Sequence, residues 1–236
     1  MEVSFYTTGE SIAKEGSEGT RVQHVVVSDF DGTIVEEDLP ELVLRRFGEK
    51  GWERYDSLLA EGRLGLEECI KQQYGMIRAE SEEQILGYIR DHCAVRSGFH
   101  ELVEFSRERG VELVVASAGL DFVIRYVLTK HRVDKVKVVC PKSEFTPHGI
   151  HVTFPDDLTA SPYGDYKEAL VARYKEQGVD VTFVGDGLSD LSSVKWAHRI
   201  FVIDGSSLER ECLRKHLTFT SIINFKPVVE FLKTST

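Results

Sequence analysis

Two aspartates follow the first strongly apolar run of the chain and suggest chemistry at the end of a buried strand. The β-branched run Val22–Val27 leads into the sequence SDFDGT, which contains Asp29 and Asp31. In an open α/β sheet, ligands bind beyond the carboxyl ends of the strands, so both carboxylates are expected to face one crevice. Two acids in one crevice repel each other unless a cation or a ligand compensates. We therefore interpret the pair as catalytic or metal-binding rather than as loop caps.

A second apolar run ends in another group of acids. The run Val181–Val184 leads into GDGLSD, which contributes Asp186 and Asp190. These acids bring the candidate cluster to four carboxylates, and a set of oxygen ligands suits a hard cation. Mg²⁺ is the expected cofactor for a phosphate substrate, because it keeps several waters and bridges carboxylate to phosphoryl oxygens.

Two further groups are candidates for binding a phosphate. An apolar run ends in Ser117, and the small residues Ala118 and Gly119 follow it with backbone N–H groups that an anion can reach. Lys167 lies near the start of a helical pattern, between the serine and the second acidic motif. Taken singly, such a serine is more often a turn residue or a helix cap, and a lone lysine is usually exposed. Their order along the chain makes them candidates.

The spacing of apolar residues predicts the elements that position these groups. Short apolar runs alternate with helical patterns of about 10–15 residues, which indicates βα units and a parallel sheet covered on both faces. We expect an α/β fold with a doubly wound, mostly parallel, Rossmann-like sheet. The expected strands after Val22–Val27 are Val111–Ala116, Val136–Val139, Val181–Val184 and Ile200–Ile203, and the expected helices are Gly98–Arg109, Asp121–Lys130, Tyr166–Glu176, Ser189–Ala197, Ser207–Lys215 and Phe225–Lys233.

About 80 residues between the first two expected strands contain helical patterns only. A crossover needs only about a dozen residues, so the excess predicts a small helical cap inserted after the first strand. We expect this cap over residues 38–95, an α/β core over residues 21–37 and 96–236, and a loosely attached tail or short extra strand over residues 1–20. The amphipathic stretches of the cap are Leu39–Phe47, Glu53–Ala60, Leu66–Ile77 and Glu82–His92.

Composition excludes several classes of function. The 236 residues are 42% hydrophobic and 29% charged, which is typical of a soluble globular chain. The net charge of −10 repels nucleic acid, so we expect no nucleic-acid partner. No apolar run approaches the roughly 20 residues of a membrane span, and no signal peptide is visible, so we expect no membrane partner. The four cysteines form no CxxC pair, which favours free thiols in the cytoplasm.

The four motifs, in this order, resemble those of the haloacid dehalogenase superfamily of phosphatases. The resemblance covers roughly residues 22–205 and includes DFDGT, the Ser117 strand, Lys167 and GDGLSD. It implies that Asp29 is the nucleophile and forms an aspartyl-phosphate. It also implies that Asp31 protonates the leaving oxygen and later deprotonates the hydrolytic water.

The same resemblance implies the ligands of the metal and of the phosphate. Mg²⁺ would be held by Asp29, the backbone carbonyl of Asp31 and Asp186, with Asp190 as a ligand or a support of the ligands. Ser117 and Lys167 would bind the phosphoryl oxygens, together with the loop of Ala118 and Gly119. Removing either side chain would raise the activation barrier by about 2–4 kcal/mol.

The long helical insertion is similar to the cap of the phosphoserine-phosphatase-like branch of this superfamily. Within that branch, the sequence AGLDF at 118–122 and Asp38, seven residues after Asp31, are similar to the 2-hydroxy-3-keto-5-methylthiopentenyl-1-phosphate phosphatases of methionine salvage. Asp38, Asp121 and Phe122 are the candidates for lining the leaving-group pocket. The expected substrate is a small phosphorylated metabolite.

Other hypotheses remain open. Phosphoserine phosphatases tend to carry glutamate at the position of Asp38 and glycine at that of Glu168. The alternatives are a phosphatase for phosphoserine or a related phosphorylated amine or sugar, and a phosphomutase that uses the same intermediate. A receiver-like signalling domain also presents an acidic cluster, but it lacks the second acid of DFDGT and the inserted helices.

Overall fold

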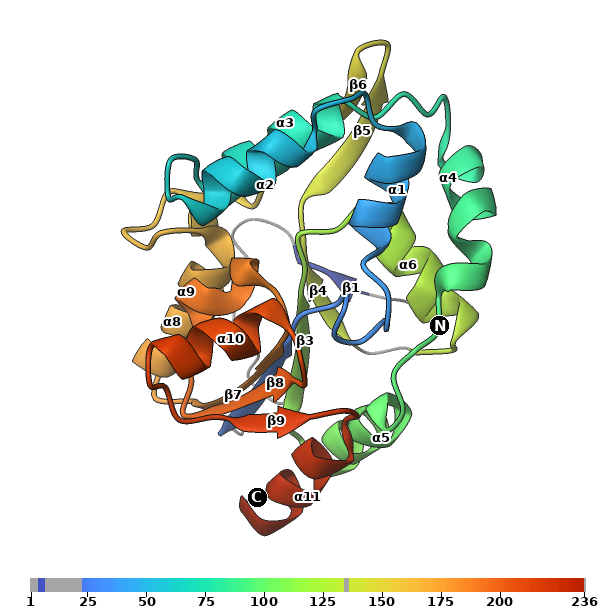
Figure 1. Ribbon diagram of the computed structural model, residues 1–236. Coiled ribbons are helices and arrows are strands. Elements are labelled where there is room, and N and C mark those ends of the chain that lie inside the picture. Colours follow the sequence, from blue (N-terminus) through green and yellow to red (C-terminus); the bar gives the residue numbers. More distant parts are fainter. Residues whose placement is uncertain (1–3, 7–22, 134–135, 236) are drawn as a thin grey trace.

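The computed structural model describes residues 4–6, 23–133 and 136–235. Within these ranges, seven parallel strands form one sheet in the order β1-β4-β3-β2-β7-β8-β9 (Figure 1). This sheet confirms the predicted doubly wound α/β fold. The strands are β1 (Ser4–Phe5), β2 (His24–Ser28), β3 (Glu112–Ala116), β4 (Lys137–Val139), β7 (Asp180–Gly185), β8 (Arg199–Ile203) and β9 (Thr220–Ile222).

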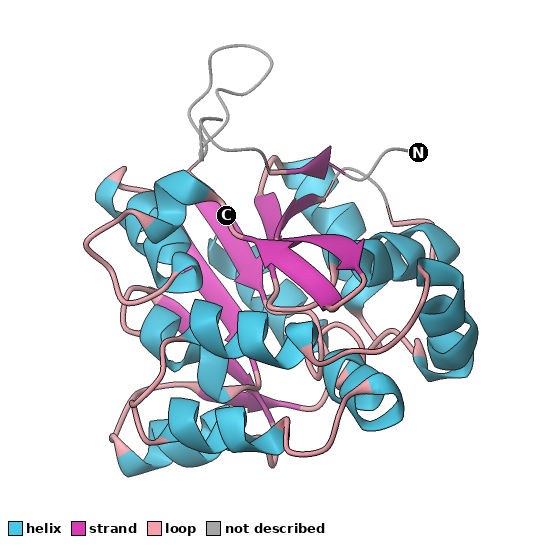
Figure 2. Ribbon diagram, turned by 90° about the horizontal axis from the view of Figure 1, so that it is seen from above, coloured by secondary structure: helices cyan, strands magenta, loops and turns pink. Residues whose placement is uncertain are grey.

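Helices cover both faces of this sheet, and Figure 2 shows the strands between them. One face carries α8 (Tyr166–Glu176), α9 (Leu191–Val194) and α10 (Ser207–Arg214). The other face carries α5 (Phe99–Arg109), α6 (Asp121–Lys130) and α11 (Lys226–Ser235). Among the described residues, no helix is long and apolar enough to cross a membrane.

Strand β2 occupies the middle of the sheet because its residues can be buried on both faces. All five residues of HVVVS are buried. The chain runs outwards from β2 through β3 to β4 and then crosses back to β7, which pairs with the other edge of β2. The winding direction therefore switches at β2, and such a switch is where open α/β sheets bind ligands. Asp29 follows β2 directly and continues its pairing, with its N–H 2.9 Å from the Val184 carbonyl oxygen.

A few element boundaries differ from the prediction. Val22 lies outside the described residues, and the first strand extends to Ser28. Strand β9 has only three residues, too short for an apolar run to indicate it. The predicted helix Ser189–Ala197 is instead a 3₁₀ turn, η2 (Leu188–Asp190), followed by the short α9. The Asp190 carboxylate, at the end of the turn, accepts the backbone N–H groups of Asp186 and Gly187 that precede it.

The predicted N-terminal tail is described only at residues 4–6. Ser4–Phe5 forms β1, which pairs in parallel with β4 at the edge of the sheet. The remainder of residues 1–20 lies outside the described residues.

The residues between β2 and α5 form a helical layer above the sheet (Figure 1). We call its members the inserted helices. Helix α1 begins at Asp38, whose Oδ1 accepts the backbone N–H of Glu41 at 2.9 Å, and a proline follows at the start of the helix. The inserted helices are α1 (Leu39–Phe47), α2 (Glu53–Ala60), α3 (Leu66–Gly75), α4 (Glu82–Ile89) and the 3₁₀ turn η1 (Arg90–His92).

An antiparallel hairpin of β5 (Lys142–Thr146) and β6 (Gly149–Thr153) packs against α3. The short helix α7 (Asp156–Thr159) follows it. The Arg78 guanidinium ties the hairpin to the end of α3, because its Nη1 donates to the carbonyl oxygens of Gly75 and His148, each at 2.7 Å. The hairpin therefore supports α3 from the side.

The close approach of Gly149 to α3 gives a test of this support. Gly149 has a φ of 122°, and a Cβ built on it would lie 2.1 Å from the Gly75 carbonyl oxygen. We expect Gly149→Ala to lower the free energy of unfolding by about 3 kcal/mol, because the hairpin must move away from the helix. Urea unfolding followed by circular dichroism measures the loss.

Gly178→Ala is the matched control. Gly178 also has a positive φ, 74°, but a Cβ there would meet nothing within 4 Å. Gly178→Ala should lower the free energy of unfolding by only about 1 kcal/mol, which is the cost of the left-handed conformation alone. Equal losses in the two variants would contradict the packing described for Gly149.

Candidate active site

Asp29 meets a buried lysine at the carboxyl end of β2. Lys167 lies in the first turn of α8, and its side chain has zero exposure. Its Nζ donates to Asp29 Oδ1 at 2.6 Å and to Asp190 Oδ1 at 2.9 Å. A lysine is almost never fully buried unless it is paired. The structure therefore joins three residues that belong to separate motifs of the sequence.

Asp190 orients both Lys167 and the loop after β7. While Oδ1 accepts from the lysine, Oδ2 accepts the N–H groups of Asp186 at 3.2 Å and Gly187 at 3.1 Å. Gly185 leaves room for this carboxylate, since a Cβ there would lie 2.5 Å from Asp190 Oδ2. Both oxygens of Asp190 thus accept hydrogen bonds from the protein, which suits a residue that positions its neighbours.

Asp186 completes a group of three carboxylates. Oxygen atoms of Asp29, Asp186 and Asp190 lie within 4.8 Å of one another. Thr33 Oγ1 donates to Asp186 Oδ1 at 2.8 Å. Gly32, with a φ of 74°, permits this approach, because a Cβ on it would lie 2.4 Å from Asp186 Oδ2. A set of oxygen ligands at this spacing fits Mg²⁺.

The concentration of acids changes their protonation. Burial and the Asp190 carboxylate raise the pKa of Asp29 well above its usual range, and Lys167 opposes the rise. Burial and the Asp190 carboxylate also raise the pKa of Asp186 to about 6. Burial alone would lower the pKa of Lys167, but Asp190 and Asp29 raise it well above its usual value. One ammonium faces three carboxylates, so a divalent cation would relieve their repulsion.

Asp31 lies apart from this group and faces the loop after β3. Ser117 Oγ donates to Asp31 Oδ2 at 3.2 Å, and Gly119 N–H donates to Ser117 Oγ at 2.9 Å. The other oxygen, Oδ1, is buried and accepts no hydrogen bond from the described residues. Burial and the Asp38 carboxylate raise the pKa of Asp31 well above its usual range. These surroundings favour the protonated form, which is the form that an acid catalyst needs.

The pocket residues predicted from sequence fall into two places. Asp38 caps α1 near the site, where its charge acts on Asp31. Phe122 packs on Phe145 of β5, with ring centroids 5.6 Å apart.

Asp121 also contacts the hairpin. Its Oδ1 accepts the Ser143 N–H at 3.1 Å and the Ser143 hydroxyl, and its Oδ2 accepts from Arg125 at 3.4 Å. These contacts hold α6 against the hairpin and account for the burial of Asp121 by packing. A place for Asp121 and Phe122 in the leaving-group pocket stays a prediction.

Two tyrosines outside the motifs hold the loop that follows β3. Tyr166 Oη donates to the Ser117 carbonyl oxygen at 2.7 Å, and Tyr74 Oη donates to the Ala118 carbonyl oxygen at 2.9 Å. Neither tyrosine can be recognised as part of the site from the sequence, because aromatic residues at helical spacing are usually core residues and nothing local distinguishes these two.

Arg96 holds the loop of the DFDGT motif. Its Nε donates to the Thr33 carbonyl oxygen and its Nη2 to that of Gly32, each at 2.8 Å. Arg96 comes directly after the inserted helices, so the guanidinium fastens the DFDGT loop at the point where the chain returns to the sheet. An arginine at such a return carries no motif, and only the folded chain reveals its contact.

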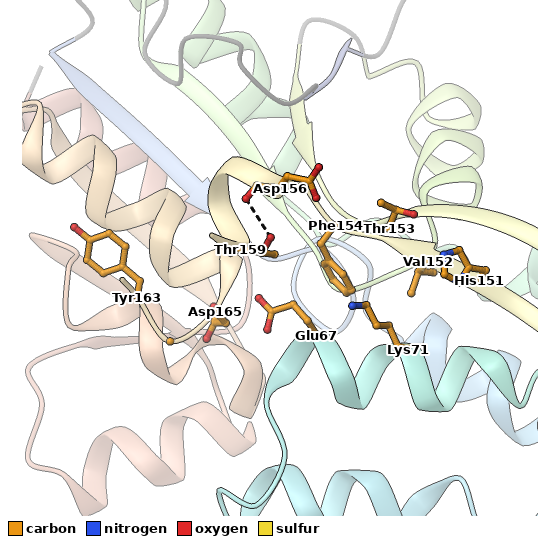
Figure 3. A pocket seen from close by; sticks show the side chains of 11 residues that line it. Glu67, Lys71, His151, Val152, Thr153, Phe154, Asp156, Thr159, Tyr163 and Asp165 are labelled. Atoms are coloured by element: carbon orange, nitrogen blue, oxygen red, sulfur yellow. Dashed lines mark hydrogen bonds between the residues drawn. The ribbon is translucent and has the colours of Figure 1, made fainter. Parts of the chain in front are cut away.

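A cavity of about 330 Å³ lies beside the site, between α3 and the segment 151–165. Figure 3 shows Glu67 and Lys71 extending from α3 into it, opposite Phe154 and Asp165. Asp165 caps α8, with its Oδ1 accepting the Glu168 N–H at 2.8 Å, and it precedes Lys167 by two residues. The cavity is lined by Glu67, Lys71, His151, Val152, Thr153, Phe154, Asp156, Thr159, Tyr163, Gly164 and Asp165.

Comparison with known proteins gives a family. The sequence model of the haloacid dehalogenase-like hydrolase family matches residues 26–195 of the chain. This span contains all four motifs, from Asp29 to Asp190.

Curated relatives match most of the chain. A 2-hydroxy-3-keto-5-methylthiopentenyl-1-phosphate phosphatase of Geobacillus thermodenitrificans is 28% identical over 215 residues, 89% of this chain and 96% of the relative. One of Brevibacillus brevis is 27% identical over 212 residues, 89% of this chain and 95% of the relative. A solved phospho-aspartyl intermediate analogue of phosphoserine phosphatase aligns with a TM-score of 0.66 at 16% identity, over 89% of this chain and 99% of that one, which shows a common fold.

The raised pKa of Asp186 predicts how stability depends on pH. A carboxyl group whose pKa rises from 3.8 to about 6 on folding binds its proton more tightly in the native state. The stabilisation that this carboxyl group gives the native state is therefore present below about pH 4 and is lost as pH rises through about 4 to 6. Without divalent cations, the free energy of unfolding of Asp186→Asn, taken relative to that of the wild type, should rise by about 2 kcal/mol from about pH 4.5 to pH 7. Urea unfolding at the two pH values measures this difference.

Asp204→Asn is the matched control. Asp204 follows the neighbouring strand β8, but it is exposed and accepts from Ser221 Oγ at 3.2 Å. Asp204→Asn therefore gives the background effect of replacing a carboxylate, against which the change in Asp186→Asn is measured. If Asp186→Asn behaved in the same way, the three carboxylates would not be coupled as described.

Proposed function

Because the chain belongs to the haloacid dehalogenase-like hydrolases, we propose that it hydrolyses phosphate monoesters through an aspartyl-phosphate on Asp29. The observation that carries this proposal is the Asp29 carboxylate at the switch point of the sheet, 2.6 Å from a fully buried lysine and beside two further acids. A nucleophile needs an open line to phosphorus and a nearby positive charge, and Lys167 supplies that charge.

In the first step, an Asp29 oxygen attacks phosphorus and the bond to the ester oxygen breaks. Asp31 donates its proton to that oxygen, so the leaving group departs as a neutral alcohol or enol. Ser117 Oγ and Lys167 Nζ bind the non-bridging oxygens, where they stabilise the charge of the transition state. The loop N–H groups of Ala118 and Gly119 are proposed to assist. In the structure, the Gly119 N–H donates to Ser117 Oγ and orients that hydroxyl.

In the second step, water attacks the phosphorus of the aspartyl-phosphate. Asp31, now ionised, accepts a proton from the water, and the bond between Asp29 and phosphorus breaks to release inorganic phosphate. The proton that left Asp31 in the first step is thereby replaced. One carboxyl group serves both steps because the demand for a proton reverses between them.

Mg²⁺ fits the donor set of the site. Asp29, Asp186 and the Asp31 backbone carbonyl are the proposed ligands, and Asp190 is the residue that holds Lys167 and the loop in place. Bound there, Mg²⁺ would supply the positive charge that lets a carboxylate approach an anionic phosphate.

We propose that the substrate is a small phosphorylated metabolite and that 2-hydroxy-3-keto-5-methylthiopentenyl-1-phosphate is the first to assay. The relatives at 27–28% identity, which match 89% of this chain, are phosphatases named for this compound. The inserted helices over residues 38–95 are proposed to act as a cap that excludes water during the first step. Four free cysteines, of which Cys69, Cys93 and Cys212 are buried, favour a cytoplasmic location.

The experiment that tests the function is a phosphate-release screen over small phosphomonoesters with Mg²⁺ or with EDTA. The wild type should release phosphate only with the metal, and Asp29→Asn should lose about 10⁴-fold or more in kcat. Asp204→Asn should keep wild-type activity. Near-native turnover by Asp29→Asn would overturn the assignment of the nucleophile. An isomerised sugar phosphate in place of inorganic phosphate would identify a mutase.

The acid role of Asp31 predicts a dependence on the leaving group. With an alkyl phosphate, Asp31→Asn should lower kcat by about 10²–10⁴-fold, because the alcohol must be protonated as it leaves. With p-nitrophenyl phosphate, whose leaving group needs no proton, formation of the aspartyl-phosphate should slow much less. Pre-steady-state release of p-nitrophenol isolates that step. An equal loss with both esters would contradict general acid catalysis by Asp31.

A further inference from the structure

Helix α3 contacts the core through two polar side chains on one of its faces. Glu67 and Tyr74 are seven residues apart, close to two helical turns, so they point in the same direction. Glu67 Oε1 accepts the backbone N–H of Tyr166 at 2.8 Å. Tyr74 Oη donates to the Ala118 carbonyl oxygen at 2.9 Å. One inserted helix is thus fastened to two separate parts of the core.

These two attachment points lie next to the two phosphate ligands. Ala118 follows Ser117 in the loop after β3, and Tyr166 precedes Lys167 in the first turn of α8. The Tyr166 N–H is one of the unpaired amides at a helix start, so Glu67 completes the hydrogen bonding of the turn that carries Lys167. Figure 3 shows Glu67 extending from α3 towards Asp165, the residue before that N–H.

The side chain of Tyr74 is buried, so the loss of its hydrogen bond to the Ala118 carbonyl would be costly. The side chain is 2% exposed, and its hydroxyl reaches a carbonyl oxygen of the loop that presents Ser117 to the site. Removing a donor from a buried acceptor costs more than an average hydrogen bond contributes. The neighbouring Ser117 carbonyl accepts a hydrogen bond at 2.7 Å from the Tyr166 hydroxyl of the core helix α8. Of these two successive carbonyls, that of Ala118 is the one that accepts its hydrogen bond directly from an inserted helix.

We propose that Tyr74 and Glu67 are positioning residues that make phosphate binding depend on the seating of α3. When α3 lies on the core, Tyr74 holds the Ser117 loop and Glu67 holds the turn of Lys167. When α3 lifts, both phosphate ligands lose a support together. The proposal rests on the phosphatase function proposed above, and it assigns to these residues a role in binding the phosphate rather than the leaving group.

The test compares Tyr74→Phe and Glu67→Leu with matched controls on the same helical layer. Tyr55→Phe removes the hydroxyl of a half-buried tyrosine of α2, whose hydrogen bonds to Arg54 and Gln72 are exposed. Glu68→Leu changes the exposed neighbour of Glu67. Glu67→Gln keeps an acceptor oxygen and is the conservative variant. The inhibition constant of inorganic phosphate against hydrolysis of p-nitrophenyl phosphate is the first readout.

We expect Tyr74→Phe and Glu67→Leu each to raise this inhibition constant by about tenfold, with Glu67→Gln close to the wild type and both controls within about twofold. Thermal unfolding separates this role from a purely structural one. A lower Tm with an unchanged inhibition constant in Tyr74→Phe and Glu67→Leu would overturn the proposal.

Hydrogen exchange gives a readout that does not need activity. Tyr74→Phe should speed exchange in a peptide covering 117–120, and Glu67→Leu in one covering 166–169, with no change in the controls. Unchanged exchange in both variants would overturn the proposal even if the wild type hydrolyses esters. A wild type that hydrolyses no phosphomonoester would refute the proposed function, and the exchange data would still decide whether α3 orders the two segments.

Discussion

The site depends on one buried ion-pair arrangement, in which the Lys167 ammonium lies between Asp29 and Asp190. Three carboxylates within 4.8 Å of one another would be strongly unfavourable without a positive charge among them. The fully buried ammonium offsets part of that repulsion, and the two carboxylates in turn compensate for the burial of the ammonium. The remaining negative charge is the physical reason for the proposed divalent cation, which would in turn favour the binding of an anionic phosphate.

The rest of the fold serves to bring these groups together. Asp29 ends β2, Asp186 follows β7, and these two strands pair side by side, so their carboxyl ends meet. Lys167 comes from the helix that leads into β7, and Ser117 follows β3 on the other edge of β2. The reversal of winding at β2 leaves the crevice between these ends open to a ligand. Glycines at 32 and 185 remove the side chains that would otherwise block the carboxylates.

The inserted helices are joined to this crevice by specific hydrogen bonds as well as by apolar packing. Arg96 fastens the DFDGT loop where the insertion returns to the sheet, and Tyr74 reaches the loop after β3. The β5–β6 hairpin supports α3 from outside, through the Arg78 guanidinium. A layer built in this way can transmit its position to the groups that we propose as phosphate ligands, because its contacts end on the backbone beside them.

The sequence by itself determined the α/β class, the doubly wound parallel sheet, the place of the long helical insertion and the candidate motif residues. It could do so because buried parallel strands give short β-branched runs, helices give a regular apolar period, and motifs at strand ends are contiguous in the chain. The tertiary structure decided that Lys167 is buried between two particular acids, that Asp31 faces Ser117 rather than the three-carboxylate group, and that Asp121 and Phe122 pack on the hairpin. It also decided the hydrogen bonds of Tyr74, Glu67, Tyr166 and Arg96 to the loops of the site. These roles depend on side chains that meet across tens of residues of chain, and local sequence patterns carry no record of such contacts.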